Sequence, residues 1–524
     1  MIFTVRQDAN THKFNQHWKM CVGSGHAPYA LRSDWASQLR KVHEELGISY
    51  VRFHGIFSDG MQIVNNFGDV FPIPGAEKFE EYNFRNVAAA YDNILSCGMK
   101  PWVELSFMPE HLASGKEQCF FFEEGNITPP ADYDRWSDLI VKFVEFLIAR
   151  YGKDEVETWF FEVWNEPDLK GFWFGTKQEY FHLYDVTARA VKSVDTELKV
   201  GGPATSGSKW IHGFLAYCKE HDCPVDYIST HQYAGDPVGM IDVDGINEEA
   251  EEKEIAFNPG ANDVFGGIKK GSLLDAFRHM MSDKSETEDL PYEGLRENAE
   301  IVRKQAGNLP VYYTEWNENA IFSAFTNDTR KVAAFDVRVI LETENTIDGS
   351  SIWCFSDIFQ EFHLFREEFH GGFGMLTESG IPKPLYHALS MMAGLPADRL
   401  ELGVEATKGE IGIAAFQDCK SLQILLFRQK MKNLDLPKEK AELLIECVKP
   451  ARVEQQRIDA ESGNPLKIWN EMGSPAIPSP EQVREIIEKS TPLVEEPECR
   501  WADGRLLINA ELGVNDIYLL RIIK

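Results

Sequence analysis

The chain has 524 residues and a formal net charge of −30, from 83 acidic and 53 basic residues. Such an excess of negative charge disfavours nucleic acid and anionic membrane surfaces as partners. Hydrophobic residues make up 43% and aromatic residues 12% of the chain, which is typical of a well-packed globular protein and excludes a disordered one. A chain of this length is expected to form two or three domains.

Three features of the sequence bear on its compartment. The N-terminus has no basic segment followed by an apolar run, so no signal peptide is predicted. No apolar stretch approaches the roughly 18 residues that cross a bilayer. The nine cysteines are scattered, with Cys218 and Cys223 the closest pair, and this pattern suits reduced thiols. We therefore expect a cytoplasmic protein.

Strand-like and helical segments alternate between about residues 18 and 395. The apolar spacing predicts a first helix from about Ser33 to Leu46 and a last one over about 383–394. Eight strands are expected, at 19–25, 48–54, 100–107, 158–168, 198–203, 225–231, 310–317 and 350–357. This α/β pattern favours a closed (β/α)₈ TIM barrel. An open doubly wound sheet is the alternative, although no GxGxxG motif follows any strand.

The pattern of predicted elements changes near residue 398. Short strands are predicted between turns, at 411–416, 422–427, 441–446, 505–509 and 516–521, with one helix at 481–489. They indicate an all-β sandwich, which the strand at 2–5 would join as an edge. We thus predict a barrel domain, residues 14–395, and an accessory β-sandwich domain, residues 1–13 plus 396–524, which acts as a structural brace in preference to a sugar-binding module.

Two strands end in a carboxylate. The stretch 158–168 is a buried strand that stops at Pro167, which has no backbone N–H, so Glu166 lies at its carboxyl end. Glu315 ends the seventh strand in the same way. Barrel enzymes place their chemistry at this end, and strands four and seven face each other across the mouth. Two such glutamates match the acid and the nucleophile of glycoside hydrolysis.

Several other residues are expected around the same pocket. Alternation puts Glu162, Trp164 and Glu166 on one side of their strand, and its break at the mouth lets Asn165 reach the pocket too. The polar strand-end residues predicted to join them are Arg52, His54, His231 and Asp357. The aromatic residues are expected either in the core or under a sugar (Trp164, Trp316, Trp353) or as a rim platform (172–174). A metal is disfavoured because HxH and HExxH spacings are absent, and no cofactor motif is present.

An ordered set of short motifs resembles glycoside hydrolase family 39, the family of bacterial β-xylosidases and α-L-iduronidases within the retaining barrel enzymes. The motifs run nearly end to end, from Lys19-Met-Cys-Val-Gly-Ser-Gly25 through Glu124-Gly-Asn-Ile-Thr-Pro-Pro130, Phe161-Glu-Val-Trp-Asn-Glu-Pro167 and Val200-Gly-Gly-Pro203 to Phe355-Ser-Asp-Ile-Phe359, Phe369-His-Gly-Gly-Phe-Gly374 and Gly463-Asn-Pro465. Each motif alone is weak, and the ordered set is specific.

The resemblance implies a role for each site residue. Glu166 would be the acid/base and Glu315 the nucleophile, with Asn165 on the sugar 2-hydroxyl and Arg52 supporting the nucleophile. The remaining residues expected to line the sugar site are His54, His231, Trp353 and Glu361. The implied activity is that of a retaining exo-β-xylosidase, which releases xylose from short xylo-oligosaccharides through a covalent intermediate and needs no cofactor or metal.

One departure keeps alternatives open. The 78 residues from Gln232 to Leu309 exceed a usual connection of about 2–6 residues plus a helix, and the compared β-xylosidases are shorter there. This segment would lie on the active-site face, where it closes the site or makes a subunit contact, so a homo-oligomer stays open. An arabinopyranosidase, a galactosidase and a non-catalytic carbohydrate-binding protein are the other functions considered.

Overall fold

The structure is a computed structural model that describes residues 1–64, 74, 82–119, 123–234, 236, 293–320, 325–359, 367–403, 410–431 and 435–524. No helix within these ranges is both long and apolar enough to cross a membrane. Within the predicted long segment 232–309, residues 235 and 237–292 lie outside the described residues, so the expected position of the segment on the active-site face stays a prediction.

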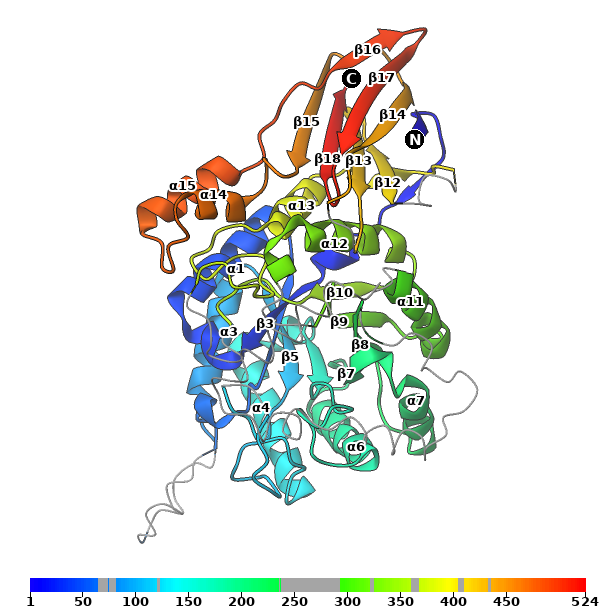
Figure 1. Ribbon diagram of the computed structural model, residues 1–524. Helices are drawn as coiled ribbons and strands as arrows, with labels where there is room; N and C mark the ends of the chain where they lie inside the picture. Colours follow the sequence, from blue (N-terminus) through cyan, green and yellow to red (C-terminus); the bar gives the residue numbers. More distant parts are fainter. Residues whose placement is uncertain are drawn as a thin grey trace.

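Eight parallel strands close into a barrel in the order β10-β3-β4-β5-β6-β7-β8-β9 (Figure 1). The strands are β3 (Cys21–His26), β4 (Tyr50–His54), β5 (Lys100–Leu105), β6 (Phe160–Val163), β7 (Lys199–Thr205), β8 (Tyr227–Tyr233), β9 (Val311–Asn317) and β10 (Gly349–Ile352). Each corresponds to a predicted strand. The (β/α)₈ prediction is therefore confirmed, and the open doubly wound sheet is wrong.

Helices follow every barrel strand. The α-helices are α1 (Ser33–Leu46), α3 (Arg85–Ser96), α4 (Tyr133–Tyr151), α5 (Lys153–Val156), α6 (Lys177–Val194), α7 (Ile211–Glu220), α11 (Glu293–Ala306), α12 (Arg330–Thr343) and α13 (Pro384–Ala393). Short 3-10 turns are η1 (His17–Lys19), η2 (Ala27–Leu31), η3 (Asp59–Met61), η5 (Ser206–Ser208) and η6 (Phe325–Asp328). Local signals set the ends: α1 stops at Gly47, where φ is +74°, and α6 begins with a Thr176/Glu179 capping box.

The barrel interior is layered. A cluster of aromatic residues and Cys21 fills the end where the strands begin, with Trp102 stacked on Phe160 at 4.3 Å between ring centroids. Tyr227 and Tyr312 meet Phe160 edge-on. The next inward-facing position along β5, two residues beyond Trp102, carries a buried carboxylate in place of another apolar side chain. This aromatic base thus closes the barrel below a charged layer.

Two sheets form the sandwich. One has the order β1-β14-β17-β16 and the other β15-β18-β13-β12-β11-β2. The strands are β1 (Ile2–Arg6), β2 (Thr11–Lys13), β11 (Asp398–Leu400), β12 (Ile411–Gln417), β13 (Ser421–Arg428), β14 (Glu439–Glu446), β15 (Arg452–Ile458), β16 (Cys499–Ala502), β17 (Arg505–Leu512) and β18 (Ile517–Ile523). Two helices interrupt them, α14 (Pro465–Glu471) and α15 (Pro480–Ser490).

The N-terminal strand joins the sandwich as predicted. β1 lies at one edge of the four-stranded sheet and pairs in parallel with β14. Every described strand of the two sheets lies outside residues 14–395. The division at residues 13/14 and 395/396 itself stays a prediction. The strands β2, β11, β15 and β16 and the helix α14 had not been predicted.

The six-stranded sheet is covered on both faces. Ile413 and Ile424 pack inside the sandwich, whereas Phe416 and Leu425 belong to the core shared with the barrel. Figure 1 shows this sheet standing over α12 and α13. Burial on both faces explains why β12 and β13 read as continuous apolar runs and not as alternating ones.

The aromatic base yields a stability prediction. Phe160→Ala should destabilise the fold by about 3–5 kcal/mol, because a large buried ring leaves a cavity between Trp102 and the two tyrosines. The urea midpoint measured by circular dichroism checks it. Phe174→Ala is the control: this ring is 52% exposed, and its loss should change the stability by less than about 0.5 kcal/mol. Equal midpoints for the two variants would contradict the layered interior.

Candidate active site

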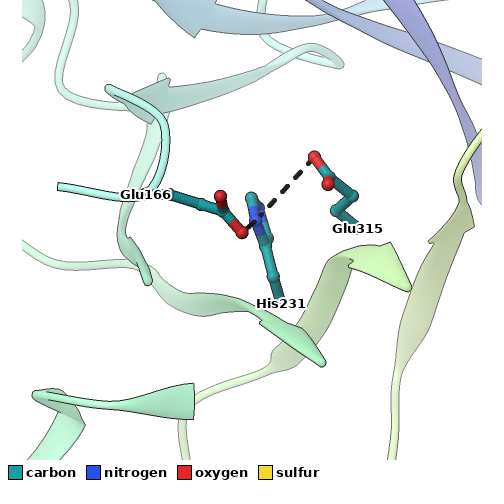
Figure 2. A group of neighbouring side chains, drawn as sticks. All are labelled: Glu166, His231 and Glu315. Atoms are coloured by element: carbon teal, nitrogen blue, oxygen red, sulfur yellow. Dashed lines mark hydrogen bonds and ion pairs between the residues drawn. The ribbon is translucent and has the colours of Figure 1, made fainter. Parts of the chain in front are cut away.

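Three side chains converge where the barrel strands end (Figure 2). His231, in β8, lies between Glu166 and Glu315, with Nδ1 at 3.0 Å from Glu166 Oε1 and 3.8 Å from Glu315 Oε2. One nitrogen or oxygen atom from each residue lies within 4.8 Å of the others. The strand register explains the pairing on one side, because His231 of β8 is aligned with Glu315 of β9. The structure thus brings together the two carboxyl groups that the sequence singled out.

The end of β6 delivers Glu166 through an abrupt backbone change. Trp164 and Glu166 have positive φ angles, +72° and +41°, which side-chain-bearing residues rarely adopt. Glu162 points inward, as predicted, but Trp164 turns to the core, where it meets Trp173 at 5.1 Å and donates to the Phe172 carbonyl. The predicted side for Trp164 was therefore wrong. The expected break in alternation is confirmed, since Asn165 and Glu166 both reach interior partners.

Arg52, fully buried in β4, organises the layer beneath the glutamates. Its Nε lies 2.7 Å from Glu162, and its Nη2 lies 2.8 Å from Glu104. The same Nη2 donates to Asn165 Oδ1 at 2.9 Å, and Nη1 lies 3.4 Å from Glu315 Oε2. One guanidinium therefore contacts three carboxylates and the amide next to Glu166. Burial would lower its pKa, but the carboxylates raise it above the ordinary value.

The surroundings of Glu166 favour its protonated form. Burial, together with the nearby carboxylates of Asp168 and Asp236, raises the pKa of Glu166 to about 8. At neutral pH it is therefore mostly a carboxylic acid, which is a proton donor. His231 adds little charge beside it, because burial lowers the pKa of its imidazole to about 4.

Glu315 has a different environment. Burial and Glu166 raise its pKa, whereas His231 and Arg52 oppose the shift. The Tyr233 hydroxyl also donates to Glu315 Oε1 at 2.5 Å, a bond that favours the ionised form. Two neighbouring carboxyl groups with such unequal surroundings can act as an acid and a nucleophile.

The same three residues are also the group of potential metal ligands that converges within the described part of the chain. One imidazole and two carboxylates form a donor set that suits zinc. The pKa of Glu166, raised to about 8, works against the ionised form that a ligand needs. That the site needs no metal stays a prediction.

His54 and Trp353 form one wall near the glutamates. The two rings lie 4.9 Å apart, and His54 Nδ1 is 2.8 Å from Glu104. Trp353 clusters with Tyr233, the residue that donates to Glu315. Both predicted residues are thus linked to the pair through a neighbour. Glu361 lies outside the described residues.

Other predicted positions are corrected. Asp357 does not face the glutamates, because its Oδ2 pairs with the buried Lys383 at 2.6 Å, and Lys383 also holds Asp328. Phe172 and Trp173 are 5% and 1% exposed and belong to the core, so the rim platform is wrong for these two residues, whereas Phe174 is exposed. Trp164 and Trp316 lie in the core, which is one of the two positions expected for them.

Sequence patterns did not point to four residues around the pair: Glu104, Asp168, Tyr233 and Asp236. Two of them carry a readable signal. Glu104 follows Trp102 by two residues along β5, so it has the same inward direction. Tyr233 follows His231 by two residues in β8 in the same manner. Asp168 and Asp236 lie beyond the strand ends, where alternation no longer predicts direction.

Arg52 yields the second prediction. Arg52→Met should destabilise the fold by about 3–5 kcal/mol at pH 7, because three buried carboxylates lose their cation. Burial works to raise the pKa of Glu104, but His54 and Arg52 hold it at about 2, below the ordinary value of 4.5. Because the pKa of Glu104 is lower in the folded than in the unfolded state, its ionised form stabilises the fold above about pH 5. This stabilisation is lost as the pH falls toward 2. The difference between wild type and variant should therefore shrink with acidity.

Urea midpoints of both proteins at pH 7 and pH 4 measure this effect. The control is Arg150→Met, which removes a surface partner of Asp92 and should change the midpoint little. A difference for Arg52→Met that is small, or the same at both pH values, would contradict the proposed electrostatic role.

Comparison with known proteins identifies the family. The model described as "Glycosyl hydrolases family 39" matches residues 1–258 and 279–507. A β-xylosidase from Caldicellulosiruptor saccharolyticus is 37% identical over 495 residues, covering 94% of this chain and 91% of that protein. One from Geobacillus stearothermophilus is 34% identical over 516 residues, with coverage of 97% and 93%.

A solved structure agrees over the full length. The crystal structure of a monomeric β-xylosidase from Caulobacter crescentus CB15 matches with a TM-score of 0.78 and 27% identity, covering 100% of this chain and 99% of that one. With a family model that matches most of the chain and relatives above 30% identity along nearly all of it, the predicted resemblance is confirmed: the chain belongs to glycosyl hydrolase family 39 and is a glycoside hydrolase.

Proposed function

We propose that this enzyme is a retaining exo-β-xylosidase that releases xylose from short xylo-oligosaccharides. The observation that carries the mechanism is the approach of the Glu166 and Glu315 oxygens to within 4.8 Å. Retaining glycosidases hold their carboxyl groups about 5–5.5 Å apart, whereas inverting ones need about 6.5–9.5 Å to admit a water. The relatives named β-xylosidase support the choice of sugar.

In the first step Glu166 is the acid and Glu315 the nucleophile. A Glu315 oxygen attacks the anomeric carbon while the bond from that carbon to the leaving oxygen breaks. The Glu166 proton passes to the leaving oxygen, and a glycosyl ester on Glu315 remains. Its pKa of about 8 keeps Glu166 protonated for this step at neutral pH. Arg52 and Tyr233, both in contact with Glu315, favour the ionised form that attacks and so oppose the effect of burial on its pKa.

The second step needs the opposite state of Glu166. The first step has already taken its proton, so Glu166 is a carboxylate and accepts a proton from the water that attacks the anomeric carbon. Esterification helps, because the charge of Glu315 raises the pKa of Glu166, and the ester carries none. The Glu315–carbon bond then breaks, and the sugar leaves with its original configuration. One residue thus serves as acid and then as base.

Asn165 is suited to hold the sugar 2-hydroxyl. Arg52 fixes its oxygen at 2.9 Å, which orients the amide. The buried Nδ2 has no hydrogen-bond partner in the described structure. A buried donor without a partner is costly, and a sugar hydroxyl would satisfy it. Such a bond strengthens as positive charge develops on the ring.

The remaining assignments follow the same reasoning. We place His54, His231 and Trp353 around the sugar, since each contacts a residue of the glutamate pair or its partners. Glu361 keeps its predicted place on the sequence resemblance alone. We further propose a cytoplasmic enzyme of xylan degradation that acts on imported oligosaccharides. Two carboxyl groups buried at a barrel mouth suit a short soluble substrate.

A panel of p-nitrophenyl glycosides tests the sugar. We expect kcat/KM for the β-D-xyloside to exceed that for the α-L-arabinopyranoside and the β-D-galactoside by at least about tenfold, since one misplaced or added group in a fitted site costs roughly 1–3 kcal/mol. Glu166→Gln/Glu315→Gln, made in parallel, controls for contaminating activity. A preference for another sugar would overturn the proposed substrate. If no aryl glycoside is turned over, the non-catalytic carbohydrate-binding protein is the function that remains.

Azide rescue tests the two roles. With Glu315→Ala, azide replaces the nucleophile in one displacement, so the product from an aryl β-xyloside should be the α-xylosyl azide. With Glu166→Ala, azide attacks the covalent intermediate, and the β-xylosyl azide should form. Proton NMR of the anomeric signal distinguishes them. The same product from both variants would contradict the assignment.

A further inference from the structure

The segment that carries Glu166 is tied to the loop that follows β7. The Glu166 backbone N–H donates to the Ala204 carbonyl at 2.9 Å. Two residues on, the Ser206 N–H donates to Asp168 Oδ1 at 2.8 Å, and Lys209 Nζ lies 3.3 Å from Asp168 Oδ2. Both oxygens of the Asp168 carboxylate are therefore engaged by this loop.

The loop itself, residues 204–210, is tightly wound. Ala204, Ser208 and Trp210 all have positive φ angles, from +53° to +65°, which side-chain-bearing residues adopt only at a cost. Ser208 lies 3.4 Å from the His231 carbonyl, so the loop also contacts β8 at the site. Strained backbone of this kind persists where its surroundings hold it, and it clusters at functional sites.

The carboxyl group of Asp168, two residues after Glu166 in the chain, acts electrostatically on the reactive carboxyl group. Its side chain is only 1% exposed, so water screens its charge poorly. Lys209, whose Nζ lies 3.3 Å from Asp168 Oδ2, supplies the balancing cation. The titratable groups that face Glu166 from the elements around it are Asp168 on its own segment, His231, Tyr233 and Asp236 from β8 and the residues after it, Glu315 from β9, and Arg52 and His54 from β4.

We propose that Asp168 is a positioning residue for the reaction, which fixes the Glu166 segment on the 204–210 loop and, with Lys209, sets how tightly Glu166 holds its proton. The proposal rests on the acid/base function proposed for Glu166. It also explains why the loop is strained, because the wound backbone holds the charge that Glu166 needs at a fixed distance. Asp168 itself does not touch the sugar.

The pH profile of kcat/KM tests the charge. In the wild type the basic limb should lie near pH 8, where Glu166 loses its proton. Asp168→Asn keeps the shape but removes a negative neighbour, so the limb should move to lower pH by roughly 0.5–1 unit. Lys209→Met removes the balancing cation, so the limb should move to higher pH, whereas Lys209→Arg should leave it in place. Shifts in the same direction for Asp168→Asn and Lys209→Met, or no shifts, would overturn the proposal.

The dependence of kcat/KM on the leaving group tests whether Asp168 positions Glu166. A 2,4-dinitrophenyl xyloside hardly needs a proton to break, whereas an unsubstituted phenyl xyloside does. Asp168→Ala releases the segment, so kcat/KM for the phenyl xyloside should fall by about 10–100-fold, part of what general acid catalysis supplies. The loss for the dinitrophenyl xyloside should stay below about threefold. Equal losses on both substrates would show general damage to the fold and would overturn the positioning role.

Two further variants separate the possible failures. Asp195→Asn removes an aspartate that pairs with Lys153 at 2.8 Å before the start of β7, and it should change neither the limb nor the leaving-group dependence. Shifts as large as those of Asp168→Asn would overturn the proposal. Glu166→Ala should lose far more activity on the phenyl than on the dinitrophenyl xyloside. If Glu166→Ala loses equal activity on both substrates, the acid function proposed for Glu166 is wrong, and the role of Asp168 that rests on it is wrong as well.

Discussion

A single buried cation holds the site together. The Arg52 guanidinium is fully buried, and a charge in that position is tolerated only when it is paired and hydrogen-bonded. Its partners come from three other strands: Glu104 from β5, Glu162 from β6 and Glu315 from β9. Since each bond is directional, the cation fixes these strands relative to one another across the barrel. The aromatic base beneath keeps the charged layer out of water, which strengthens every one of these interactions.

The same layer makes two chemically identical side chains behave differently. Glu315 touches the cation and accepts the Tyr233 hydroxyl, so its negative charge is supported. Glu166 lies near Asp168 and Asp236, whose charges, added to burial, raise its pKa to about 8. His231 joins the two without adding charge, because its imidazole is neutral at physiological pH. The division of labour thus comes from the surroundings, as in other enzymes with paired carboxylates.

Sequence patterns predicted the residues that lie within the regular barrel strands. They failed for residues at which the backbone departs from strand geometry. The eight barrel strands were predicted from the alternation of strand-like and helical segments along the chain. The position of Glu166 at a strand end was predicted from Pro167, and that of Glu315 from the similar end of the seventh strand. The side of the strand to which Trp164 points could not be predicted, because its positive φ turns the side chain to the opposite face. Asp357 was expected to end the eighth strand, but β10 already ends at Ile352. Asp357 pairs instead with Lys383, a lysine distant in sequence that gives no local sign of this contact. β16 was missed because it is short and largely exposed, so no apolar pattern marks it.

The packing of the sandwich argues for a brace. Its six-stranded sheet is buried on both faces, so the face toward the barrel is closed to any ligand. That face adjoins α12, the helix that follows the strand of Glu315, and Arg330 at the start of α12 bonds Asp516 at 3.0 Å and the Val514 carbonyl. At the other end of the helix Arg399 holds Glu344 at 2.6 Å. A helix fixed at both ends by the second domain cannot shift without disturbing β9. These contacts support the predicted brace, in which the sandwich would immobilise the strand that carries the proposed nucleophile.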